Sequence, residues 1–107
     1  MKAESAAPAL GLRIRQLDLA KDGGRAVDEL RALLLEHQLL VIAKQQLTSQ
    51  QLMDFGRGWG ELMTHPSSVA RKNPYVQKLA NQGDVKGTGF GAWHSDMTWH
   101  PTPPWIT

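Results

Sequence analysis

A histidine and an aspartate stand two positions apart near the end of the 107-residue chain, at His94 and Asp96. In an extended strand, residues i and i+2 point to the same face and lie roughly 7 Å apart. Both side chains can then lean toward one small cation. A neutral imidazole and a carboxylate are two thirds of the 2-His-1-carboxylate set that holds non-haem Fe(II). The alternative is an ordinary polar pair on the surface of a strand.

The residues around this pair resemble the iron-binding segment of the TauD/TfdA family of Fe(II)- and 2-oxoglutarate-dependent dioxygenases. The resemblance rests on Trp93–Trp99 and on the downstream Pro103-Pro104. It extends over roughly residues 9–107, through blocks that keep the family's order and spacing: Asp18-Leu19, Glu36-His37-Gln38, Leu39–Ala43, Leu47-Thr48, Gln50-Gln51-Leu52 and Gly60–Pro66. It implies that His94 and Asp96 bind Fe(II), with 2-oxoglutarate and O2 as co-substrates and succinate and CO2 as products.

The same resemblance implies three substrate contacts. His65, which Pro66 pushes toward an extended conformation, would donate a hydrogen bond to a small anionic organic substrate; a surface loop histidine is the alternative. Phe90 stands near the position where taurine-specific members carry an asparagine. An apolar contact would replace a polar one there, so taurine itself is disfavoured. Met97 is the third position, although regular strand parity would turn it away from the metal face.

The family's remaining site residues, a distal histidine for iron and an arginine for 2-oxoglutarate, have no counterpart in these residues. We therefore expect the N-terminal portion of a dioxygenase, with a flexible tail over 1–8 and part of the catalytic domain over 9–107, and we expect the isolated chain to be inactive. The fold class that the resemblance implies is α+β and mainly β: a double-stranded β-helix, or jelly roll, with flanking helices, incomplete in this chain.

Composition excludes several other classes. The chain is 41% hydrophobic and 21% charged, which is typical of a globular domain. It contains 12 Lys and Arg against 10 Asp and Glu, and these are scattered, so nucleic acid is not expected as a partner. It has no cysteine, which excludes disulfides and thiolate metal sites. It contains neither an apolar run of membrane-spanning length nor a secretion signal, so we expect no membrane association and a cytoplasmic location.

Hydrophobic spacing predicts the elements of the first half. Leu10, Leu12 and Ile14 alternate with other residues, which indicates a half-buried strand. A turn is expected over 21–24, and then a helix over 24–37, because apolar residues recur at helical spacing there. His37 would end that helix, where a structural role suits it. The continuous apolar run 39–43 predicts a strand buried on both faces.

The second half begins with a capping box at Thr48 and Gln51. The helix that follows should bury Leu52, Phe55 and Trp59, be weakened by Gly56 and Gly58, and end at Gly60. Strands are expected over 75–80 and 93–99, with a glycine-rich loop between them that is either a substrate lid or a plain connector. On the last strand, Trp93 and Trp99 should pack behind the metal face.

Two further hypotheses stay open. The apolar faces of 39–43 and 93–99 would suit association, so the chain could be a non-catalytic binding or homo-oligomerisation module derived from a dioxygenase scaffold. A hydrolytic zinc site could use His94, Asp96 and His100. However, His100 lies six residues beyond His94, about 20 Å along a straight strand, so only a sharp reversal of the chain would bring it back.

Overall fold

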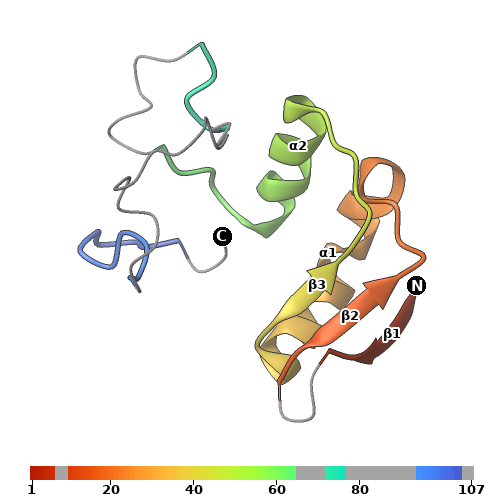
Figure 1. Ribbon diagram of the computed structural model, residues 1–107. Coiled ribbons are helices and arrows are strands. Elements are labelled where there is room, and N and C mark those ends of the chain that lie inside the picture. Colours follow the sequence, from red (N-terminus) through yellow and green to blue (C-terminus); the bar gives the residue numbers. More distant parts are fainter. Residues whose placement is uncertain (7–9, 65–71, 77–93, 105–107) are drawn as a thin grey trace, which may run out of the picture. The chain divides into compact units, whose positions relative to one another are not determined.

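The computed structural model of the protein describes residues 1–6, 10–64, 72–76 and 94–104. The chain divides into two compact units, Met1–Leu62 and Met63–Thr107. The helices and strands of the described residues all belong to the first unit (Figure 1). In order they are β1 (Lys2–Ser5), β2 (Leu12–Arg15), α1 (Leu19–His37), β3 (Leu40–Ile42) and α2 (Ser49–Trp59).

The strands form one mixed sheet in the order β1-β2-β3. β1 runs antiparallel to β2, with Ala3 opposite Ile14, and β3 runs parallel to β2, with Ile42 opposite Ile14. Parallel neighbours need a crossover connection, and α1 supplies it (Figure 1). Ile14 on the central strand is only 1% exposed, so the sheet contributes directly to the core.

Helix α1 begins five residues before the predicted start. Asp18 is its N-cap, and the carboxylate accepts a hydrogen bond from the backbone N–H of Ala20 at 3.0 Å. The hydrogen bond from Lys21 and the backbone N–H of Ala20 hold the pKa of Asp18 below its ordinary value. The predicted turn over 21–24 is therefore wrong: the acidic cap starts a helix there, and the buried face of that helix already includes Leu19 and Gly23.

The predicted capping box of α2 is confirmed. The hydroxyl of Thr48 accepts from the backbone N–H of Gln51 at 3.2 Å, and the Gln51 side chain accepts from the Thr48 N–H at 2.9 Å. Trp59 is buried, and the ring of Phe55 lies edge-on to it with centroids 6.0 Å apart. Leu52 is 44% exposed, so its predicted burial is wrong.

Two glycines lie where α1 and α2 pack together. A Cβ atom on Gly58 would lie 2.7 Å from Cγ2 of Val27, and one on Gly23 would lie 2.9 Å from Cδ2 of Phe55. Real Cβ contacts are longer, so any side chain here would force the helices or their neighbours apart. The role of Gly58 is therefore close packing, and its low helix propensity is the accompanying cost.

Gly58→Ala should destabilise the protein by about 1–2 kcal/mol. The gain in helix propensity, up to about 1 kcal/mol, is outweighed by overpacking against Val27, which typically costs about 1–3 kcal/mol. Gly24→Ala is the matched control, because a Cβ on Gly24 meets nothing within 4 Å. It should stabilise α1 by about 0.5–1 kcal/mol. Urea unfolding followed by far-UV circular dichroism measures both. Equal stabilisation by the two variants would contradict the packing role of Gly58.

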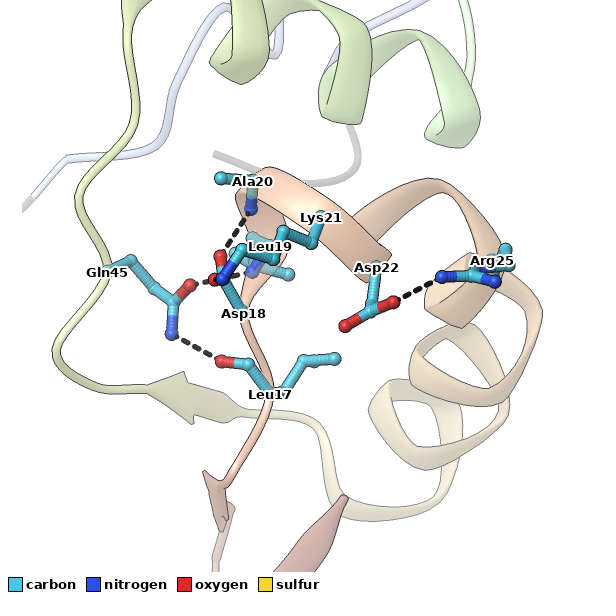
Figure 2. A network of polar contacts seen from close by, with 8 residues as sticks. All are labelled: Leu17, Asp18, Leu19, Ala20, Lys21, Asp22, Arg25 and Gln45. Atoms are coloured by element: carbon cyan, nitrogen blue, oxygen red, sulfur yellow. Dashed lines mark hydrogen bonds and ion pairs between the residues drawn. The ribbon is translucent and has the colours of Figure 1, made fainter.

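One glutamine side chain bonds to three backbone groups of the first unit, and Figure 2 shows it beside two of them, those of Leu17 and Leu19. Gln45 accepts from the N–H of Leu19 at 2.9 Å, and its amide donates to the carbonyls of Leu17 at 2.8 Å and Ala43 at 3.0 Å. These bonds connect the segment after β3 to the turn between β2 and α1. They satisfy backbone groups that neither the sheet nor the helix can pair.

Several strand predictions need correction. Residues 2–5 of the predicted tail form β1, and β3 is half-buried where burial on both faces was expected. Of the strand predicted over 75–80, Tyr75 and Val76 are not in a strand, and 77–80 lie outside the described residues. The described part has helices of 19 and 11 residues beside strands of 4, 4 and 3. That architecture is compatible with the edge of a double-stranded β-helix but does not itself form one.

Within the described residues, no helix has both the length and the apolar character required to cross a bilayer.

Candidate metal site

His94 and Asp96 lie next to each other in the second unit. Nε2 of His94 is 3.2 Å from Oδ1 of Asp96, and the two side chains are 59% and 49% exposed. Their polar atoms therefore face one another while remaining open to solvent. The expectation that the two side chains converge on one point agrees with this geometry.

The backbone that follows the pair is a turn, although a strand was predicted over 93–99. Met97 has φ of 46°, in the left-handed region that an extended strand cannot contain. The N–H of His100 donates to the carbonyl of Met97 at 2.9 Å, which closes the turn. Residues 94–100 contain no strand, and Trp93 lies outside the described residues. The pair therefore lies directly before a turn and not within a regular strand.

The predicted place of Trp99 is also wrong. Its side chain is 71% exposed, so it does not pack behind the pair. The indole ring lies edge-on to the imidazole of His100, with centroids 5.8 Å apart. Met97 is partly buried. These positions differ from the prediction because side chains in a turn do not alternate between two faces as they do in a strand.

The distance within the pair suits two ligands of one metal ion. Imidazole nitrogen and carboxylate oxygen bind first-row metals at about 2.0–2.2 Å, so two donors at a right angle around the ion stand about 3 Å apart. The observed 3.2 Å between Nε2 and Oδ1 fits that spacing. A direct hydrogen bond between the two side chains accounts for the same distance. Geometry alone thus permits both a ligand pair and an ordinary ion pair.

The proposed zinc alternative lacks its third ligand. Nδ1 of His100 lies 3.1 Å from both the backbone N and the O of Thr102, and 3.2 Å from its hydroxyl. Across the described residues, which include His94, Asp96 and His100, no group of three or more His, Cys, Asp or Glu side chains is placed to hold a metal ion. The turn does not return His100 to the pair.

The remaining candidate residues lie elsewhere. His65 and Phe90 are outside the described residues, so the substrate contacts expected of them stay predictions. His37 is the last residue of α1, as predicted, and its carbonyl accepts from the N–H of Gly11 at 3.1 Å. Its imidazole lies 3.6 Å from the carboxylate of Glu36, which is compatible with the structural role expected of it.

Sequence reasoning missed one contact within the turn. The hydroxyls of Ser95 and Thr98 lie 3.3 Å apart, so that a hydrogen bond joins the residues on either side of Asp96 and Met97. The signal was present, because serine and threonine favour turns and stabilise them through side-chain hydrogen bonds. The hydrogen bond was not predicted because a strand was expected here, and the side chains of residues three positions apart do not meet on a strand.

An adjacent imidazole and carboxylate in the segment predicted to bind iron are the ligand types of the 2-oxoglutarate-dependent oxygenase class. The chain belongs to the TauD/TfdA family: the model of the family described as taurine catabolism dioxygenase TauD, TfdA family, matches residues 2–107. The family recognised from the sequence motifs is confirmed.

One curated relative matches over the whole chain. It is an alpha-ketoglutarate-dependent sulfonate dioxygenase from Saccharomyces cerevisiae, 26% identical over 120 residues. The match covers 100% of this chain and 29% of the relative, so the chain spans less than a third of that protein's length.

Proposed function

We propose that these residues belong to a dioxygenase that uses Fe(II) and 2-oxoglutarate, and that His94 and Asp96 are two of its iron ligands. The observation that carries the proposal is the 3.2 Å separation of Nε2 and Oδ1 in a chain of the TauD/TfdA family. When bound there, iron with 2-oxoglutarate would supply the activation of O2 that oxidises the substrate, with succinate and CO2 as co-products.

The two side chains contribute complementary donors. His94 would bind through a neutral ring nitrogen and Asp96 through an ionised carboxylate, because only deprotonated groups bind metals. Because both side chains are partly exposed, further ligands from other parts of the protein would have access to an ion held by them. In this proposal the third histidine, the arginine that pairs with 2-oxoglutarate and most strands of the jelly roll come from other parts of a longer protein. The isolated chain would then bind metal weakly and turn over no substrate.

The substrate we propose is a small organic anion of the sulfonate type. The name of the yeast relative supports this class. Within it, His65 would donate a hydrogen bond to the anionic group, while Phe90 and Met97 would offer apolar surface to the carbon skeleton. This combination favours a sulfonate with an apolar substituent over taurine, whose ammonium group needs a polar partner.

A non-catalytic association module is the second candidate. Large apolar side chains are exposed on the first unit, at 47% for Leu10, 70% for Leu35 and 44% for Leu39. Exposed apolar surface of this kind marks interaction sites when it forms a continuous patch. A homo-oligomer without catalytic activity would cover exposed side chains of this kind and leave His94 and Asp96 as a simple ion pair.

An activity assay separates the two candidates. The full-length protein, supplied with Fe(II), 2-oxoglutarate and O2, should release succinate in proportion to an alkyl- or arylsulfonate that it consumes. Taurine should be used less well, and the 107-residue chain alone should release no succinate. Succinate is measured by chromatography and the oxidised product by mass spectrometry. Full-length protein that forms stable oligomers but consumes neither 2-oxoglutarate nor any sulfonate would favour the association module.

A further inference from the structure

The turn that carries the ligand pair is held by its own polar contacts. The Ser95 and Thr98 hydroxyls meet across Asp96 at 3.3 Å, and the His100 N–H bonds to the Met97 carbonyl at 2.9 Å. We infer that the Ser95–Thr98 hydroxyl bridge and the left-handed backbone of Met97 position Asp96 against His94 for metal binding. The inference rests on the proposed function, and it assigns positioning roles to residues that do not contact the metal.

Burial cannot supply this positioning. About half of the Asp96 side chain is exposed, at 49%, so burial restrains this carboxylate only in part. An exposed carboxylate on an unrestrained segment would lose conformational entropy on binding, and that loss weakens affinity. A hydroxyl bridge that spans the carboxylate residue removes part of this freedom in advance. Groups that hydrogen-bond directly to metal ligands typically change metal affinity about 10–100-fold when removed, and a bridge between the residues beside Asp96 should act at the lower end of that range.

The backbone of Met97 makes the second contribution. A φ of 46° at a residue with a Cβ is disfavoured by about 1–2 kcal/mol relative to right-handed geometry. Local contacts must therefore hold it, and the His100 N–H bond and the hydroxyl bridge are placed to do so. The reversal at Met97 follows Asp96 directly and brings Thr98 back to Ser95, so that the hydroxyl bridge closes around the backbone of Asp96. A residue that prefers an extended backbone would open the turn.

Thr98→Val tests the hydroxyl bridge, because valine has nearly the shape of threonine without the hydroxyl. The matched control is Thr98→Ser, which keeps the hydroxyl. Mn²⁺ is the probe, added to the 15N-labelled chain. Binding is followed by paramagnetic broadening of the His94 ring signals and the Asp96 amide signal, a readout that detects weak sites. We expect Thr98→Val to weaken Mn²⁺ binding about ten-fold. Thr98→Ser should stay within about two-fold of the parent chain, since the oxygen that makes the bridge is retained.

Met97 gives a second, independent pair of variants. Met97→Gly should keep the turn, because glycine adopts positive φ without penalty. Met97→Val should weaken Mn²⁺ binding by a factor similar to that of Thr98→Val, because β-branched residues are strongly disfavoured at positive φ. Unchanged amide signals from α1 and α2 confirm in each variant that the first unit remains folded.

The outcomes separate this inference from the proposed function. Localised Mn²⁺ broadening that is the same in the parent chain, Thr98→Val and Met97→Val would leave the metal site standing and overturn the positioning roles. Mn²⁺ broadening that is absent from His94 and Asp96 in the parent chain would overturn the metal site, and the positioning roles with it. Weaker Mn²⁺ binding in Thr98→Val and Met97→Val, together with nearly unchanged binding in Thr98→Ser and Met97→Gly, would support the inference.

Discussion

Asp96→Ala should reduce Mn²⁺ or Fe(II) binding by more than about 100-fold, since removal of a direct ligand exceeds the 10–100-fold effect of removing an orienting group. The remaining imidazole is one ligand, and a single side chain does not hold a divalent ion against water. The free energy of unfolding should change by no more than about 0.5 kcal/mol, because exposed ion pairs contribute little to stability. Calorimetric metal titration and urea unfolding measure the two effects separately.

A second exposed ion pair supplies the control. Asp54 and Arg57 on α2 lie 2.7 Å apart with side chains 59% and 52% exposed, close to the exposure of Asp96 and His94. Asp54→Ala should therefore match Asp96→Ala in stability but leave metal binding unchanged. If both variants bind Mn²⁺ as the parent chain does, the pair at 94 and 96 is an ordinary surface contact and the iron-site proposal fails.

Leu30→Ala should cost about 2–5 kcal/mol of unfolding free energy, the range for truncating a fully buried leucine. Leu30 is 0% exposed in the middle of α1, so its removal leaves a cavity that neighbouring atoms fill only in part. A unit of some sixty residues has a total stability of about 3–9 kcal/mol, so this loss should leave much of it unfolded at 37 °C. The denaturation midpoint followed by circular dichroism gives the measurement.

Leu35→Ala is the matched control for Leu30→Ala. Both residues lie on α1 and lose the same atoms, but Leu35 is 70% exposed. Its variant should remain within about 0.5 kcal/mol of the parent chain. Comparable losses for the two would show that Leu35 is covered in solution. Such a result would point to the association surface considered above.

The helices and strands that could be predicted are those whose sequence pattern lies within a few neighbouring residues. The apolar spacing of α1, the capping box at Thr48 and the β-branched run in β3 each correspond to an observed element. The start of α1 was misplaced because Gly23 and Gly24 read as a turn. Only the packing of Phe55 beside Gly23 shows why a glycine belongs inside that helix.

Features that depend on distant partners or unusual backbone angles could not be predicted in this way. β1 has the polar sequence Lys2–Ser5 and is recognisable only through its pairing with β2. Gln45 bonds to Leu17 and Leu19, which lie more than 25 positions earlier in the chain. At the candidate site, the residue types and their proximity followed from the motif. The turn could not be predicted from the motif, because methionine has no preference for positive φ.

The contacts described for the ligand segment are all short in range: 94 with 96, 95 with 98, 97 with 100, and 100 with 102. Each of these contacts closes within the nine residues 94–102. The geometry of the pair is therefore encoded to a large extent by a short stretch of contiguous sequence.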